Sequence, residues 1–171
     1  NDFTAGMKKV LKPGGTITLE IPHLMRLIEH TQFDTIYHEH YSYLSLHIIN
    51  RIFATAGLRV FDVEELTTHG GSLRIYCCHD EEKRPGKNVV STIRDEEERR
   101  GLQNLSAYQT FQQRADQIKD RLLAFLIEQK RIGKKVAAYG AAAKGNTLLN
   151  YAGIKRDLIP YVCDVAPSKQ G

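Results

Sequence analysis

The stretch that decides the fold is residues 7–20, which read MKKVLKPGGTITLE. The first part predicts the end of a helix covering residues 4–11, which the Lys-Pro-Gly-Gly turn at residues 12–15 stops. Apolar and polar residues then alternate over residues 16–21, and this pattern predicts a strand with one buried face. A helix, a tight turn and a strand in this order indicate an α/β fold.

The next elements continue this pattern. After a short helix predicted at residues 24–29, Ser45 is the expected N-cap of a helix, and Gly57 supplies the left-handed residue that stops it. Residues 58–66 and 72–78 look like two strands, and we expect them to form an antiparallel pair at the edge of a sheet.

The second half of the chain reads differently. Residues 80–87 are charged and contain proline and glycine, which predicts a linker, and residues 89–131 show a charged helical pattern. From residue 133 a short strand, a small-residue turn, a helix and another strand predict a βαβ unit. The long helix carries an apolar row that we expect to pack in the core: Tyr108, Phe111, Ala115, Ile118, Leu122, Phe125 and Ile132.

Composition limits the class of protein. Hydrophobic residues make up 42% and charged residues 26% of the chain, as in soluble globular proteins. The net charge of +4 is spread out, and no basic stripe interleaved with aromatic residues predicts a nucleic-acid partner. We see no apolar run long enough to span a membrane and no signal peptide. Cys77, Cys78 and Cys163 have neither disulfide nor metal-ligand spacing, which predicts reduced thiols in a cytoplasmic protein.

The ends of the chain indicate a piece of a longer protein. The sequence begins with Asn1 and ends at Gly171, directly after a turn-like Ala-Pro-Ser-Lys. We therefore expect part of any active site to lie elsewhere in the parent protein. The sequence does not predict an oligomeric state.

Residues 35–43, TIYHEHYSY, are the strongest candidate for chemistry. They place tyrosines, histidines and a glutamate after the predicted strand, at the edge where open α/β sheets bind ligands. Histidine transfers protons near neutral pH, so we expect the stretch to line a pocket. The alternative is a loop that only caps the sheet. A metal site at His38, Glu39 and His40 is a further alternative, but no second ligand cluster accompanies them, and we predict no metal.

Four motifs in order carry a resemblance. They are the Lys-Pro-Gly-Gly turn, the Tyr37-x-Glu39-His40 motif, HGGSLR at residues 69–74 and YGAAAKGN at residues 139–146. Together they resemble the nucleotide-sugar C-methyltransferases, which combine a class I methyltransferase domain with a C-terminal Rossmann-like domain. The resemblance implies an α/β chain: the end of a methyltransferase sheet (residues 1–79), a charged linker with helices (80–132) and the start of a second Rossmann-like domain (133–171).

The resemblance also implies a reaction. An enzyme of this kind removes a proton beside the ketone of a nucleotide-linked keto-deoxysugar and transfers a methyl group to that carbon from S-adenosylmethionine. Tyr37, Glu39 and His40 match the residues that line the sugar pocket, with His40 as the base. General-base help of this kind is worth about 10²–10⁴-fold, and a tyrosine hydroxyl can stabilise the enolate.

The resemblance implies that the C-terminal domain helps to hold the nucleotide of the substrate. Gly140, Lys144 and Asn146 are the residues expected to do so, since a helix N-terminus and a lysine can also attract an anion. Arg74 is expected to reach the pyrophosphate. Each of these turns also fits a purely structural role. The glycine-rich loop that cradles S-adenosylmethionine in the resembled family has no counterpart in this chain.

Two other functions remain open. The chain could be a nucleotide-binding or structural Rossmann-like fragment without catalysis. A nicotinamide oxidoreductase built on the Gly140 turn is disfavoured, because the turn lacks the G-x-G-x-x-G spacing although Asp164 ends the next predicted strand.

Overall fold

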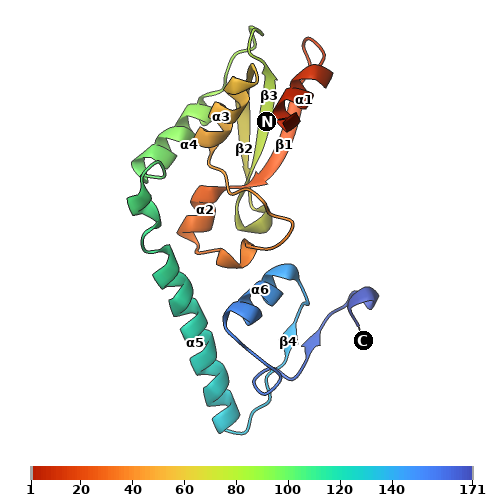
Figure 1. Cartoon of the computed structure of the whole chain (residues 1–171), viewed down its shortest axis with the longest axis vertical. Helices are drawn as coiled ribbons and strands as arrows, with labels where there is room; N and C mark the ends of the chain where they lie inside the picture. Colours follow the sequence, from red (N-terminus) through yellow and green to blue (C-terminus); the bar gives the residue numbers. More distant parts are fainter. Residues whose placement is uncertain (1, 171) are drawn as a thin grey trace. The chain divides into compact units, whose positions relative to one another are not determined.

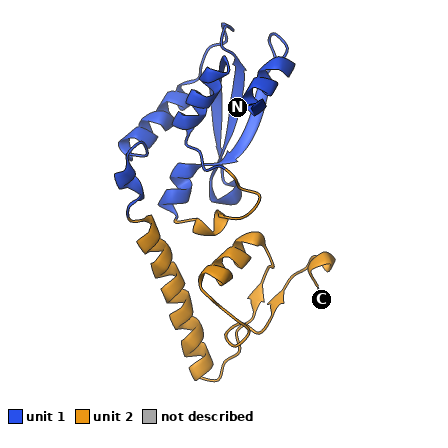
Figure 2. Cartoon of the chain, in the orientation of Figure 1, with its two compact units in different colours: residues 1–30, 42–109 blue, residues 31–41, 110–171 orange. Residues whose placement is uncertain are grey.

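The computed structural model describes residues 2–170, which form two compact units (Figure 2). Unit 1 contains residues 2–30 and 42–109, and unit 2 contains residues 31–41 and 110–170. Both units mix helices with a small sheet, which confirms the predicted α/β class. The predicted domain boundaries at residues 79/80 and 132/133 stay predictions, since compact units and domains need not share boundaries.

Unit 1 is built on a three-stranded sheet in the order β1-β3-β2 (Figure 1). The strands are β1 (Ile17–Pro22), β2 (Leu58–Leu66) and β3 (Ser72–His79), and both pairings are antiparallel. The predicted antiparallel pair is confirmed, with β2 at an edge and β3 in the centre of this sheet.

The helices of unit 1 follow the sequence signals closely. They are α1 (Asp2–Val10), α2 (Leu24–Glu29), α3 (Leu46–Thr55) and α4 (Asn88–Arg99). The Ser45 hydroxyl caps α3 by accepting a hydrogen bond of 3.3 Å from the Ile48 amide. Gly57 ends the helix with a φ of 68°, a conformation that suits glycine best.

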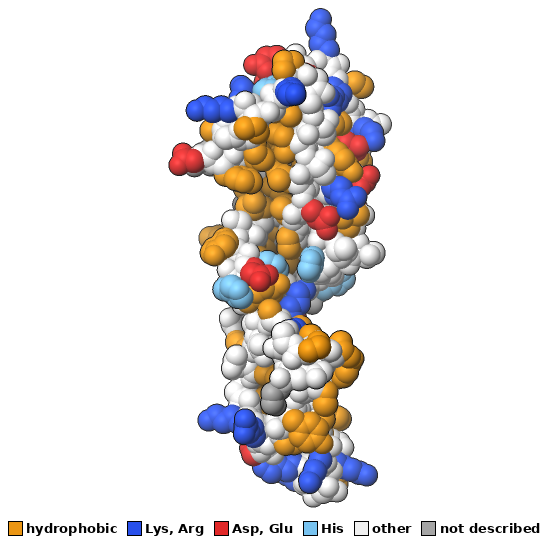
Figure 3. Space-filling view, turned by 90° about the vertical axis from the view of Figure 1, so that its right-hand side faces the viewer, with side chains coloured by type: hydrophobic (Ala, Val, Ile, Leu, Met, Phe, Trp, Pro, Cys, Tyr) orange, Lys and Arg blue, Asp and Glu red, His pale blue; other side chains and the backbone are white. Residues whose placement is uncertain are grey.

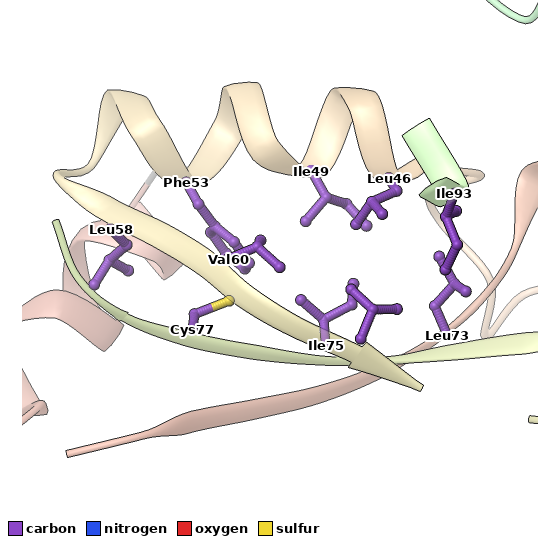
Figure 4. Packing of buried hydrophobic residues seen from close by; sticks show 10 residues of the cluster. Leu46, Ile49, Phe53, Leu58, Val60, Leu73, Ile75, Cys77 and Ile93 are labelled. Carbon is purple, nitrogen blue, oxygen red and sulfur yellow. The ribbon is translucent and has the colours of Figure 1, made fainter. Parts of the chain in front are cut away.

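The core of unit 1 lies between α3 and the sheet (Figure 4). Leu46, Ile49 and Phe53 project from α3 toward β3, where Leu73 and Ile75 are fully buried. Burying one such side chain contributes about 1.5–3 kcal/mol, so this layer holds the unit together. The remaining members of the cluster are Leu58, Val60, Val63, Cys77 and Ile93.

The segment predicted as a linker, residues 80–87, packs against the turn at residues 12–16. Arg84 donates hydrogen bonds to the Thr16 hydroxyl at 2.6 Å and to the Gly14 carbonyl at 2.8 Å. Its guanidinium also lies over the Phe61 ring, 4.5 Å from the centroid. Arg84 therefore holds the Pro-Gly-Gly turn, although about 70 residues separate them in the sequence.

Unit 2 contains the long helix α5 (Phe111–Arg131) and a strand-helix-strand unit: β4 (Ala138–Tyr139), α6 (Ala143–Tyr151) and β5 (Val162–Cys163). The two strands are parallel, which confirms the predicted βαβ unit, although each is shorter than the strands predicted at residues 135–139 and 158–163. Short 3₁₀ helices occur at Phe33–Thr35, Leu105–Tyr108 and Pro167–Lys169 in the described chain, with another turn of this kind at Thr68–Gly70.

The predicted apolar row of α5 is wrong at its C-terminal end. Ala115 is buried, but Phe125 is 53% and Ile132 57% exposed. Leu126 is buried instead, because it lies about 100° round the helix from its neighbour. Among residues 2–170, no helix is both long and apolar enough to cross a bilayer.

Candidate active site

The candidate site lies on residues 31–41 of unit 2, which we call the histidine loop. Its first part is the 3₁₀ helix Phe33–Thr35, which packs on α6, and the Phe33 and Tyr151 rings lie 4.9 Å apart. The Tyr151 hydroxyl donates to the Asp116 carboxylate at 2.6 Å. The loop is therefore seated on the βαβ unit through an aromatic contact.

Hydrogen bonds of the main chain shape the loop around its histidine. The Tyr37 amide donates to the Thr35 carbonyl, and the His40 amide donates to the Tyr37 carbonyl, each at 3.0 Å. These tight turns place the side chains of Tyr37 and His40 on the same side, with ring centroids 4.4 Å apart. Both residues are half-buried.

The two ring nitrogens of His40 have different partners. Nδ1 lies 3.0 Å from the Thr35 carbonyl oxygen, and Nε2 lies 3.2 Å from the Tyr37 hydroxyl. A carbonyl only accepts hydrogen bonds, so Nδ1 must carry a hydrogen. In the neutral ring Nε2 then has the lone pair, and Tyr37 donates to it. This is the arrangement of an oriented base, in which the bond at one nitrogen fixes the tautomer at the other.

The structure brings together only part of the predicted site. Tyr37 and His40 meet, whereas the side chain of Glu39 is 69% exposed and lies 3.7 Å from that of His38, which is still more exposed. The Thr35 carbonyl was not predicted. A main-chain group leaves no signal in the residue types, so sequence reasoning could not have found it.

Arg74 lies on the exposed face of the sheet in unit 1. Its guanidinium donates to the carboxylates of Glu20 and Glu64, each at 3.2 Å, and these flank it on the neighbouring strands. The bond to Glu20 raises the pKa of the Arg74 guanidinium. Arg74 thus links the three strands through its ion pairs, and its contact with a nucleotide stays a prediction.

The turn before α6 already contains an anion. Gly140 has a φ of 96°, and the next amide, that of Ala141, donates to the Asp164 carboxylate at 2.7 Å. The Ala166 amide donates to the same carboxylate at 2.8 Å. These bonds, the Ala166 bond first, lower the pKa of Asp164. The roles of Gly140, Lys144 and Asn146 toward a nucleotide stay predictions.

Two other pockets differ from the histidine loop in the residues that line them. A hollow of about 320 Å³ in unit 1 is lined almost wholly by apolar side chains of α1, β1 and α3, and Figure 3 shows hydrophobic side chains gathered over this unit. A smaller pocket in unit 2 is lined by lysines, Arg156 and Asp157. Over residues 2–170, no group of three or more His, Cys, Asp or Glu side chains is placed to hold a metal ion.

Comparison with known proteins identifies the family to which the chain belongs. Residues 67–171 match the family described as the C-methyltransferase C-terminal domain. The chain belongs to this family. C-methyltransferase NovU from Streptomyces niveus is 35% identical over 169 residues, which cover 97% of the chain and 40% of NovU. The chain thus spans about 40% of the length of this curated relative.

These findings confirm the resemblance to C-methyltransferases. The histidine loop precedes the region that matches the family, so the case for its chemistry depends on its geometry. The family implies S-adenosylmethionine as methyl donor, but the turn before α6 does not fit this cofactor. The small-residue turn after β4 is the candidate for a nucleoside-binding turn, and the Asp164 carboxylate takes its first amide.

Proposed function

We propose that the parent protein of this chain is a C-methyltransferase that acts on a nucleotide-linked keto-deoxysugar. One observation carries the proposal. In a chain of the C-methyltransferase family, His40 is held at Nδ1 by the Thr35 carbonyl and keeps a basic Nε2 beside the Tyr37 hydroxyl. Forming a carbon–carbon bond to a methyl group requires a carbanion, and an oriented neutral imidazole can generate one.

The first step is proton transfer. Nε2 of His40 takes a proton from the carbon next to the ketone, and the electrons of that C–H bond move into the enolate. The ring then carries hydrogens on both nitrogens, and the Thr35 carbonyl stabilises the resulting cation. A base positioned in this way accelerates such a step by about 10²–10⁴-fold.

Tyr37 stabilises the enolate oxygen of the substrate. Its 3.2 Å bond to Nε2 is long for an O–H donor and therefore weak, so the hydroxyl can turn to the enolate oxygen when substrate binds. Glu39 is exposed and suits a hydrogen bond to a sugar hydroxyl. S-adenosylmethionine supplies the methyl group to the enolate carbon when bound, and we propose that residues outside this chain hold it.

The assay separates proton abstraction from methyl transfer. The full-length protein is incubated in D₂O with a keto-sugar nucleotide and no methyl donor, and NMR follows loss of the signal of the proton beside the ketone. A second assay follows transfer of labelled methyl from S-adenosylmethionine. We expect His40→Ala to slow both reactions by about 10²–10⁴-fold.

His38→Ala is the matched control, because the His38 side chain is 84% exposed two residues away. We expect its rates to stay within about twofold of the wild type, as for most surface substitutions. Unchanged rates in His40→Ala would remove the proposed base and favour a structural role for the loop.

The nucleotide contacts are tested separately in each unit. We propose that Gly140, Lys144 and Asn146 hold the nucleotide in unit 2, and that Arg74 contacts a phosphate in unit 1. Thymidine diphosphate is titrated calorimetrically into the full-length protein and into Lys144→Ala and Arg74→Ala. Weaker binding in a variant supports its contact, and an unchanged affinity contradicts it. A cytoplasmic location stays a prediction from the sequence.

A further inference from the structure

The segment that carries the histidine loop, residues 24–44, begins and ends within unit 1, where its two ends lie side by side. His23 follows β1 directly, and it forms an isolated parallel bridge with Leu44, which precedes α3. The Leu24 amide donates to the Leu44 carbonyl at 3.2 Å. The departing and returning ends of the segment are therefore neighbours at its base.

A buried carboxylate from a third element joins the two ends. Glu97 of α4 is 0% exposed, and its Oε1 lies 2.7 Å from Nε2 of His23 and accepts the Leu46 amide at 2.6 Å. Its Oε2 accepts the His47 amide at 2.8 Å. Glu97 thus binds the residue just before the segment and the first turn of the helix that follows it.

The chemistry of these partners explains why a charge is tolerated here. An isolated buried carboxylate is very costly, but the N-terminus of α3 provides free amides and the positive end of a helix dipole. Ser45 caps only the Ile48 amide, so Glu97 completes the cap. Within residues 2–170 the Nδ1 atom of His23 is buried with no hydrogen-bond partner, and Nε2 holds the ring through its contact with Glu97.

We propose that Glu97 and His23 are positioning residues that fix the base of the segment and thereby the placement of the catalytic histidine. The inference rests on the proposed function of His40. Neither side chain needs to touch the substrate, and their effect reaches the reaction through the main chain of residues 24–44. A displacement of about 1 Å at a catalytic group can cost about 100-fold in rate.

The test uses the full-length protein and the variant Glu97→Gln. Glutamine keeps the volume, but its amide group donates where Oε2 now accepts from His47, so the cap loses a bond and its charge. We expect kcat to fall by about 10- to 100-fold with KM for both substrates unchanged. Hydrogen–deuterium exchange should rise in residues 24–44 and at the start of α3. Glu98→Gln, the exposed neighbour on α4, is the matched control and should change neither quantity.

A milder pair of variants keeps the test usable if Glu97→Gln folds poorly. His23→Leu removes one donor and leaves both α3 amides on Glu97, so the helix cap survives. We expect a fall in kcat and faster exchange in residues 24–44. His23→Gln restores an N–H group toward Glu97 and should recover most of the loss, which a role in packing alone would not require.

The outcomes separate the two proposals. Unchanged kcat and exchange in Glu97→Gln and His23→Leu, with an inactive His40→Ala, would overturn the positioning role. Full activity of His40→Ala would overturn the proposed function instead, and the exchange measurement would then decide whether Glu97 holds the segment.

Discussion

Two regions of the chain use a histidine in opposite ways. In unit 1, His23 is 1% exposed and its Nε2 faces the Glu97 carboxylate. In unit 2, His40 is half-buried, with a carbonyl at Nδ1 and a hydroxyl at Nε2. A carboxylate accepts, so Nε2 of His23 is a donor, whereas the carbonyl at Nδ1 of His40 leaves the lone pair on Nε2. The partner, more than the residue type, decides which histidine can do chemistry.

The largest effect is expected from removing the buried carboxylate of Glu97. Glu97→Ala removes the shared acceptor of His23 and of two helix amides, so these donors lose their partner away from water. We expect the free energy of unfolding to fall by several kcal/mol, because each buried donor left without an acceptor costs about 1–3 kcal/mol. Urea denaturation of the full-length protein measures it. Glu98→Ala should cost less than about 0.5 kcal/mol. Equal losses of stability in the two variants would contradict a stabilising role of the Glu97 carboxylate.

A second prediction compares the two regions through their glycines. The Gly71 carbonyl accepts a hydrogen bond from the His23 amide. Gly71 has a φ of 123°, and a Cβ added to it would lie 2.8 Å from the Arg26 side chain. Gly140 has a φ of 96° but no atom within 4 Å of an added Cβ. Gly71→Ala should cost about 1–3 kcal/mol and Gly140→Ala less, because only the first adds a clash to the backbone strain. Thermal unfolding of the two variants gives the order, and the reverse order would refute it.

A third prediction tests the role of the Tyr37 hydroxyl beside His40. Tyr37→Phe removes the hydroxyl beside His40 and keeps the aromatic contact. Turnover should fall about tenfold, equivalent to about 1.4 kcal/mol of barrier, because the enolate loses a donor. The melting temperature should stay the same, since the change deletes only a weak bond. A stability loss with unchanged turnover would make Tyr37 a structural residue.

The smallest effect involves the thiols of the two units. Burial raises the pKa of Cys77 to about 12, whereas Cys163 is exposed. At pH 8 only about one Cys77 in 10⁴ is therefore a thiolate, the form that reacts. A thiol reagent at pH 8 should label Cys163 at once and Cys77 only in denaturant, as peptide mass spectrometry would show. Rapid labelling of Cys77 in the folded protein would mean that the core of unit 1 opens readily.

Local signals allowed most of the fold to be predicted. The turn after α1, the N-cap Ser45 and the stop at Gly57 act through neighbouring residues, so they are legible in the sequence. The strands β4 and β5 were predicted too long, because apolar runs do not show where pairing ends.

The candidate site was less predictable. Tyr37 and His40 were found through residue types, but their relation depends on the Thr35 carbonyl. Glu97 stands in a charged run, DEEERR, and resembles its solvated neighbours. One signal was present: Glu97 lies four residues after Ile93, on the buried face of α4. Spacing alone could not show that a helix N-terminus faces it.

The order of the strands has a consequence for synthesis on the ribosome. The middle strand β3 is the last of the three to be translated, and it pairs with residues of β1 made more than fifty positions earlier, such as Ile17 with Cys77. Until β3 emerges, β1 and β2 have no partner between them, and their apolar faces stay open to chaperones. The sheet of unit 1 can therefore be completed only after residues up to His79 have been translated.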